Sequence, residues 1–382
     1  MMEEEFLAVC LATQKGVGRK TLYRLLCEAG SIKGIFDMGK KDIISCVGQR
    51  YAENIFAVCK EGGKDALERC IELGGEIIRK YEKKGIRCIS CISEQFPDRL
   101  RQIPDPPFCL YVIGELPKEK MACVAMIGAR ACSTYGRGVA YSFGKELAGA
   151  GVGIISGMAR GIDGVAQEGA IAGGGQTYAV LGGGVDYCYP SEHRGLYEAI
   201  SQKGGVISEY LPGTEPRANF FPERNRIISG MADIVLVIEA RKRSGTYITV
   251  TQALEQGREV YAVPGRVTDV LSDGCNALIK DGAGVADSAM VILEALRYRG
   301  YQIRNNGIGA DRERRSPLNC ENDGIRGRLI DILDVTPIHI NELYRAMNVE
   351  GEVIMEEIMT ELVHMELDGM VNNCGNYYAK CF

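Results

Sequence analysis

The stretch "CVAMIGARACSTYGRGVAYSFGKELAGAGVGIISG", residues 123–157, contains the repeating unit that decides the fold. It begins with a short apolar run, continues through a glycine-containing turn and a segment with apolar residues at helical spacing, and ends in a second apolar run. Short runs rich in Val and Ile are typical of strands covered on both faces. The stretch therefore predicts a strand, a helix and a second, parallel strand.

The same unit recurs as far as Val263. The later apolar runs are "TYAVLGGG", "GVISEY", "DIVLVIEA" and "EVYAVPG". Strands that alternate with helices predict an α/β fold with a doubly wound parallel sheet. In such a sheet the ligand lies beyond the carboxyl ends of the strands, near a topological switch.

The regions around this unit predict further domains, as expected for 382 residues. Residues 1–73 form a helical block whose "GVG" turn has the form of a helix-hairpin-helix (SAM-like) element, with a plain packing unit as the alternative. Residues 74–297 are expected to form an extended Rossmann-like domain. Residues 298–323 are polar and predict a linker. Residues 324–382 predict a winged helix whose acidic face favours a protein partner over DNA.

Composition narrows the function classes. With 46% hydrophobic and 25% charged residues the chain is globular, and its net charge of −5 argues against nucleic-acid binding by the whole surface but not by a local basic cleft. No apolar run is long enough to span a membrane, and the acidic N-terminus is unlike a signal peptide, so we expect a cytoplasmic protein. The 15 cysteines and three histidines form no ligand pattern, so we expect reduced thiols and no metal site.

The loops after the expected strands are rich in glycine and arginine. Examples are "GARACSTYG", "SGMARGID" and "EARKRSGTY". Backbone amides, helix N-termini and guanidinium groups together bind phosphate. Phe220, Phe221, Tyr187 and Tyr189 add stacking surfaces. Phosphates in series with exposed bases describe single-stranded nucleic acid better than one small ligand.

The stretch "FFPERNRIISG", residues 220–230, is expected to be a loop at this edge. It would bring Arg224 and Arg226 to phosphates, offer Phe221 as a stacking platform and use Asn225 to brace the turn. Arg160, in contrast, has an alternative, which is to pair with Asp163 or Glu168 instead of contacting nucleic acid.

The chain lacks the sequence motifs of several enzyme classes. The first glycine turn is "GARACSTYG" and not the G-x-G-x-x-G of dinucleotide sites, no nucleoside triphosphate loop occurs, and no serine elbow follows a strand. We therefore expect a binding protein without catalytic activity and without a cofactor.

The motifs resemble those of the DNA-processing protein A (DprA/Smf) family. The resemblance rests on "GAR" at 128–130, "SGMARGID" at 156–163 and "RNRIISG" at 224–230, in the family's order. It implies a homodimeric protein that binds single-stranded DNA, protects incoming strands and loads the RecA recombinase in natural transformation. The loops and motifs together predict DNA contacts from Gly128, Arg130, Ser156, Gly157, Arg160, Gly161, Gly183, Gly184, Arg217, Phe221, Arg224, Asn225, Arg226, Ser244, Gly245 and Thr246.

A second class of function stays open at this point. Rossmann-type phosphoribohydrolases resemble the chain in "GAR…YG", but "ARKRSGTYITVTQALE" lacks their Pro-Gly-Gly turn and has no glutamate three residues after the threonine. The alternative is therefore a nucleotide-binding sensor or a phosphoribohydrolase-like enzyme.

Overall fold

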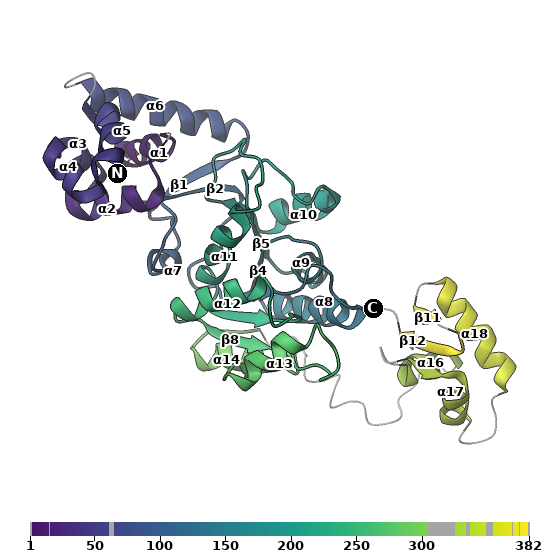
Figure 1. Ribbon diagram of the computed structural model, residues 1–382. Helices are drawn as coiled ribbons and strands as arrows, with labels where there is room; N and C mark the ends of the chain where they lie inside the picture. The colour runs from purple at the N-terminus through teal and green to yellow at the C-terminus, as the bar shows by residue number, and fades with distance from the viewer. Residues whose placement is uncertain are drawn as a thin grey trace. The chain divides into compact units, whose positions relative to one another are not determined.

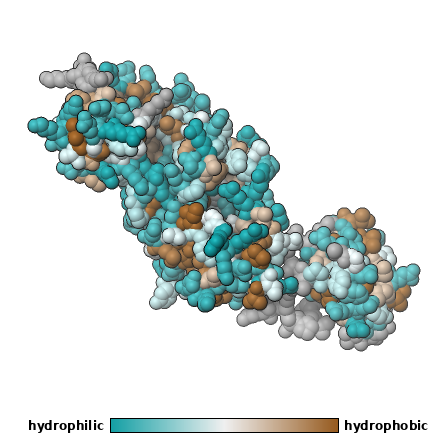
Figure 2. All heavy atoms as spheres, viewed as in Figure 1, coloured by the Kyte–Doolittle hydropathy of each residue, from teal (hydrophilic) through white to brown (hydrophobic). Residues whose placement is uncertain are grey.

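The computed structural model describes residues 2–14, 16–60, 65–304, 325–333, 337–348, 354–368, 370–373 and 375–380 (Figure 1). The chain divides into two units, Met1–Ile308 and Gly309–Phe382, each with its own hydrophobic core. In the described part, no helix combines the length and apolar character needed to cross a membrane. The face seen in Figure 2 is mostly hydrophilic, with small groups of hydrophobic residues between.

The first unit begins with a group of helices: α1 (Met2–Ala12), α2 (Arg19–Ala29), α3 (Ile32–Asp37), α4 (Lys40–Val47), α5 (Gln49–Lys60) and α6 (Asp65–Glu82). Gly30 ends α2 in the left-handed region at φ 73°, and the Ser31 hydroxyl then caps α3 by accepting from the Gly34 amide. The predicted domain boundary at 73/74 lies inside α6. Gly74 packs there against the Phe6 backbone of α1, where a Cβ would be 1.9 Å from the carbonyl oxygen.

A nine-stranded sheet forms the centre of this unit, in the order β1-β2-β6-β5-β4-β3-β7-β8-β9. Its strands are β1 (Arg87–Ser90), β2 (Cys109–Gly114), β3 (Cys123–Ile127), β4 (Gly153–Ser156), β5 (Thr177–Val180), β6 (Gly205–Ser208), β7 (Ile234–Val237), β8 (Glu259–Ala262) and β9 (Gly284–Val285). All strands from β6 to β9 in this order are parallel, whereas β1 and β2 join antiparallel at one edge. The predicted parallel strands, β3 to β8, are confirmed.

Helices cover both faces of the sheet. They are α7 (Asp98–Arg101), α8 (Thr134–Gly149), α9 (Ile162–Ala172), α10 (Arg194–Lys203), α11 (Phe220–Gly230), α12 (Thr246–Glu255), α13 (Asp273–Lys280) and α14 (Ala289–Tyr298), with a 3₁₀ turn at Ser191–His193. In β3, Ala125 and Ile127 pack into the core that includes α11 and α12. Val124 and Met126 face the other way, into the core of α8, α9 and α14. Burial on both faces explains the continuous apolar runs.

The segment 220–230, predicted as a loop, is the helix α11. That prediction is wrong because Pro222 lies in the first turn of the helix, where the backbone N–H groups have no helical partner and proline is tolerated. The segment after it, "ERNRII", is compatible with helix, and Ile227 and Ile228 are buried in the core. A proline-containing stretch that is typical of a loop is therefore the beginning of a helix packed on the core.

The predicted linker begins as part of the first unit. Tyr298 ends α14, the Tyr301 hydroxyl donates to Asp233 Oδ1 at 2.8 Å, and the Arg304 amide donates to the Ala150 carbonyl at 3.1 Å. Residues 305–323 of the predicted linker lie outside the described residues.

The second unit contains α16 (Ile325–Ile332), α17 (Ile340–Met347) and α18 (Met355–Leu367). Its antiparallel sheet has the order β10 (Ile338–His339), β12 (Tyr377–Lys380), β11 (Val371–Asn373). These are the helices and the hairpin that the sequence predicts; the winged-helix assignment and its protein partner stay predictions.

Candidate functional site

A cavity of about 570 Å³ opens where the chain order of the sheet reverses, between β3 and β7. Loops following β3 and β4, one side of α11 and the first turn of α12 line it. The carboxyl ends of parallel strands meet here, which is where open α/β sheets bind ligands. The predicted DNA-contacting residues that line the cavity are Gly128, Arg130, Phe221, Arg224, Asn225, Ser244, Gly245 and Thr246.

Helix α11 presents one side to this cavity. Phe221, Arg224, Asn225 and Ile228 all line it, at the three- and four-residue spacing that places side chains on one helix face. Ile228 of α11 and Thr249 of α12 also line the cavity, and the sequence did not predict either of them. The helical spacing within "FFPERNRIISG" is the signal that would have identified Ile228.

Arg130 and two aromatic rings form a stack at the cavity. The Arg130 guanidinium lies 5.3 Å from the centre of the Phe221 ring, and the Tyr189 ring lies 5.6 Å from it on a tilted plane. Arg130 is exposed, and no carboxylate among the described residues pairs with it. Its charge is therefore available to an anionic ligand beside an exposed ring.

Arg224 is built into the wall of the cavity. Its side chain donates to the carbonyl oxygens of Gly157, at 2.9 Å, and Val180, and it is 4% exposed. Burial lowers the pKa of Arg224 to about 10, opposed by the charge of Asp163, so the group stays positive at neutral pH. Its Nε has no hydrogen-bond partner in the described part of the chain.

Asp163 lines the cavity beside Arg224. The Gly157 amide donates to its carboxylate at 3.1 Å, and burial raises the pKa of Asp163 against the opposing effect of Arg224. Asp163 thus holds the loop after β4 in place from the first turn of α9, whose N-cap is Gly161 and has no side-chain cap bond.

The N-terminus of α12 supplies a second set of donors. Ser244, Gly245 and Thr246 line the cavity, and the buried Ser244 hydroxyl has no partner among the described residues. Helix N-termini favour anions because their amides are unpaired and the helix dipole is positive there.

The N-terminus of α8, in contrast, is already occupied by a carboxylate. Glu239 accepts from the Ser133 amide at 2.9 Å and from the Ser133 hydroxyl, and it is 3% exposed. A Cβ on Gly136 would be 2.2 Å from the Glu239 carboxyl carbon, so glycine is needed there. This is the turn at which dinucleotide-binding folds hold a pyrophosphate. The Glu239 carboxylate fills this position and repels a second anion, so a pyrophosphate cannot bind there.

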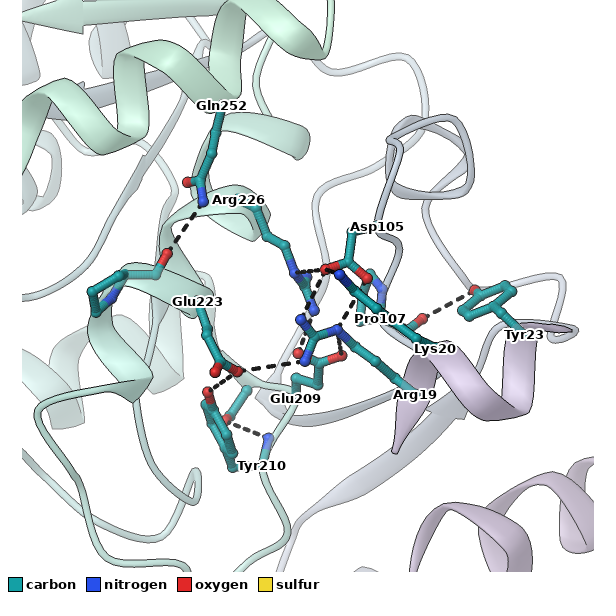
Figure 3. Close-up of polar contacts among 12 residues, drawn as sticks. Arg19, Lys20, Tyr23, Asp105, Pro107, Glu209, Tyr210, Glu223, Arg226 and Gln252 are labelled. Carbon is teal, nitrogen blue, oxygen red and sulfur yellow. Dashed lines mark hydrogen bonds and ion pairs between the residues drawn. The ribbon is translucent and has the colours of Figure 1, made fainter. Parts of the chain in front are cut away.

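Arg226, predicted to contact phosphate, lies elsewhere. It is 4% exposed and forms ion pairs with Glu209 and, at 3.4 Å, with Asp105, on the side of α11 turned away from the cavity (Figure 3). We expected a loop that brings Arg224 and Arg226 to the same edge. In the helix α11, residues two positions apart point in nearly opposite directions, so only Arg224 faces the cavity.

The remaining predicted residues mostly shape the loops. Arg160 pairs with Glu192 and not with Asp163 or Glu168. The Ser156 hydroxyl donates to the Met126 carbonyl at 2.6 Å, and Gly184 donates to Thr214 at 2.8 Å.

Close approach explains the other glycines. A Cβ on Gly157 would meet the Arg224 guanidinium at 2.5 Å, and one on Gly183 would meet Pro216 at 3.0 Å. Gly161 has φ 75° and lies against the Ala129 carbonyl. Arg217 is exposed over the Phe220 ring, 5.9 Å from its centre.

Comparison with known proteins places this site in context. The family model for DNA recombination-mediator protein A matches residues 87–297, which include every cavity-lining residue. DNA processing protein DprA from Streptococcus pneumoniae is 41% identical over 234 residues, covering 61% of this chain and 82% of that protein.

Two solved structures are also similar. The X-ray structure of DprA from S. pneumoniae superposes with a TM-score of 0.62 at 32% identity, covering 74% of this chain and 95% of that one. DNA processing protein A from Helicobacter pylori, a structure that addresses its single-stranded DNA binding mode, superposes with a TM-score of 0.50 at 28% identity, covering 55% and 96%.

Proposed function

The chain belongs to the DNA recombination-mediator protein A family, and on that premise we propose that it binds single-stranded DNA at the β3–β7 cavity, with little sequence preference. The H. pylori relative is a single-stranded DNA-binding protein. In the proposed role the chain acts as a cytoplasmic homodimer that protects incoming strands and delivers them to the RecA recombinase. The family resemblance supports these partners, and the cavity supports the ligand.

The Arg130–Phe221–Tyr189 stack is the observation that carries this proposal. Arg130, which has no carboxylate partner among the described residues, lies beside the half-buried Phe221 ring and near the exposed Tyr189 ring, and so offers charge to a phosphate and a flat surface to a base. Stacking tolerates any base because every base has a π-face, and guanidinium contacts to phosphate carry no sequence information. Duplex DNA buries its base faces, so we expect single strands to bind more tightly.

A second aromatic–arginine pair begins one residue before the cavity-lining Phe221. The Tyr210 and Phe220 rings are stacked with centres 4.1 Å apart, and Arg217 lies over Phe220. Phe220 and Phe221 are consecutive residues at the start of α11, so each of two adjacent positions carries an aromatic–arginine pair. This repetition favours a polymer over a single small nucleotide.

The rival proposal, a nucleotide sensor or phosphoribohydrolase-like enzyme, has weaker support. Glu239 fills the α8 N-terminus, and the position three residues after Thr246 is Thr249, buried and without a carboxylate. We propose binding without catalysis.

Titration of the full chain with labelled oligothymidylates of increasing length, a duplex of the same length and a mononucleotide competitor tests the proposed function. We expect affinity to rise with length until the site is filled, duplex to bind more weakly, and the mononucleotide to compete poorly. Equal affinity for duplex and single strand would contradict the proposal. Saturable competition by the mononucleotide, with no length dependence, would favour the sensor.

A further inference from the structure

We propose that Arg19, in the N-terminal helical group, is a positioning residue for the DNA site, because it anchors α11 through an ion-pair cluster on the side opposite the cavity. This inference rests on the proposed function for its DNA readout. The cluster consists of Arg19, Asp105, Glu209, Glu223 and Arg226 (Figure 3).

Arg19 joins three segments that are far apart in the sequence. Its Nε and Nη2 donate to the two oxygens of Asp105 at 3.1 and 2.8 Å, the paired geometry that makes arginine–carboxylate contacts strong. Its Nη1 lies 3.5 Å from Glu223 of α11, and its Nε lies 3.7 Å from Glu209 after β6. Arg19 thus connects α2 to three segments: the one before β2, the one after β6, and α11.

Helix α11 contacts the cavity with one side and the ion-pair cluster with the other. Phe221, Arg224 and Asn225 face the cavity, whereas Glu223 and Arg226 face the cluster. A rigid helix transmits a displacement of one side to the other. The position of Phe221 therefore depends on what holds Glu223 and Arg226.

The aromatic residues add a second connection. The Tyr210 hydroxyl donates to Glu223 at 3.3 Å, and the Tyr210 ring stacks on Phe220. Arg19 holds Glu223, Glu223 holds Tyr210, and Tyr210 supports the residue next to Phe221.

The charge balance explains why Arg19 matters more than its neighbour Lys20. Without Arg19, the buried Glu209 and the half-buried Asp105 would share one buried arginine, Arg226, and Glu223, whose side chain is 45% exposed, would lose its contact with Arg19. An uncompensated buried carboxylate is costly, so the helix would shift or admit water. The Lys20 ammonium lies 3.7 Å from Asp105 on a side chain that is 70% exposed, and such exposed pairs contribute little.

A double-mutant cycle on the full chain tests the inference. Arg19→Gln and Lys20→Gln each remove one positive charge, so Lys20→Gln is the matched control, and both are combined with Phe221→Ala. We expect Arg19→Gln to weaken oligothymidylate binding about fivefold, but less than about twofold when Phe221 is already alanine, because interacting residues are not additive. Lys20→Gln should change affinity by less than about twofold in either background.

The dependence of affinity on salt separates positioning from direct contact. If Arg19 positions the ring, Arg19→Gln leaves the salt slope equal to that of Lys20→Gln. Additive effects of Arg19→Gln and Phe221→Ala, or a reduced salt slope for Arg19→Gln alone, would overturn the inference.

Hydrogen–deuterium exchange without DNA keeps the inference separate from the proposed function. Arg19→Gln should speed exchange in 220–230 but not in β3 to β5, and Lys20→Gln should do neither. Unchanged exchange in α11 would overturn the anchor. If the wild type fails to bind single strands, the proposed function falls, whereas the exchange result still decides the anchor. If Arg19→Gln does not fold, Arg19→Lys, which keeps the charge but loses the paired bonds, undergoes the same comparison.

Discussion

Asp105 is the residue on which two arginines meet. It accepts both paired bonds from Arg19 and lies 3.4 Å from the Arg226 Nε. Burial alone would raise the pKa of Asp105, but the Arg19 hydrogen bonds and the Arg226 charge outweigh it and hold the pKa below its usual 3.8. In Glu209, which is more deeply buried, burial raises the pKa despite the same two arginines.

The lowered pKa of Asp105 predicts an acid-dependent contribution to stability. A carboxylate with a depressed pKa in the folded state stabilises the protein above its unfolded-state pKa, and this contribution is lost as the pH falls through the folded-state value. Asp105→Asn should therefore lower the melting temperature at neutral pH, with the gap to wild type narrowing below pH 3.8. Thermal unfolding of both proteins across this range measures the gap. A gap that stays constant in acid would contradict the assignment.

Arg130 and Arg226, both predicted to contact phosphate, show what sequence can and cannot predict about a single residue. Arg130 was predicted to be available, and it is exposed beside Phe221. Arg226 is predicted to contact phosphate, but it is buried and forms ion pairs with Asp105 and Glu209, which are distant in sequence. Arginine type and local spacing do not reveal such partners, because only the folded sheet brings them together.

Among the structural elements, the loop between β4 and α9 depends on one glycine for its backbone conformation. Gly161 precedes α9 with φ 75° and ψ −131°, a backbone region that L-residues rarely adopt. A Cβ there would lie 2.3 Å from the Ala129 carbonyl and 2.5 Å from the Arg130 carbonyl. The loop after β4 can therefore pack against the loop after β3 only with glycine at this position.

Gly161→Ala should destabilise the fold by about 2 kcal/mol or more, since the strained backbone and the contact with two carbonyls add. Gly245→Ala is the matched control: it also precedes a helix at the cavity, has φ −59°, and nothing lies within 4 Å of an added Cβ. Urea unfolding of both variants measures the difference. Equal stability of the two would show that the loop rearranges freely.

Elements buried on both faces were the most predictable part of the fold. The strands β3 to β7 are buried along their whole length, and the glycine-rich segments after them identify the edge that holds the cavity. Helix α11 was missed because Pro222 and its charged neighbours resemble a loop, although proline in a first turn costs little. The boundary at 73/74 follows from the family resemblance and falls inside α6, where glycines 74 and 75 allow close packing on α1.

The chain as a whole is acidic, but exposed arginines lie near the cavity. The net charge is −5, yet Arg130 and Arg217 lie exposed over aromatic rings near the cavity. Binding of a phosphate chain then depends on a few local contacts and not on the overall field. Such binding weakens with salt in proportion to the phosphates neutralised.

The salt dependence of single-strand binding by Arg130→Ala and Phe221→Ala tests whether DNA binds at the β3–β7 cavity. Arg130→Ala should reduce the slope of log affinity against log salt by roughly 0.7, the value for one single-strand phosphate contact. Phe221→Ala should cost about 1 to 3 kcal/mol with an unchanged slope, because stacking releases no counterions. If both variants bind single strands with wild-type affinity and slope, the DNA path lies elsewhere and the β3–β7 cavity is not the site.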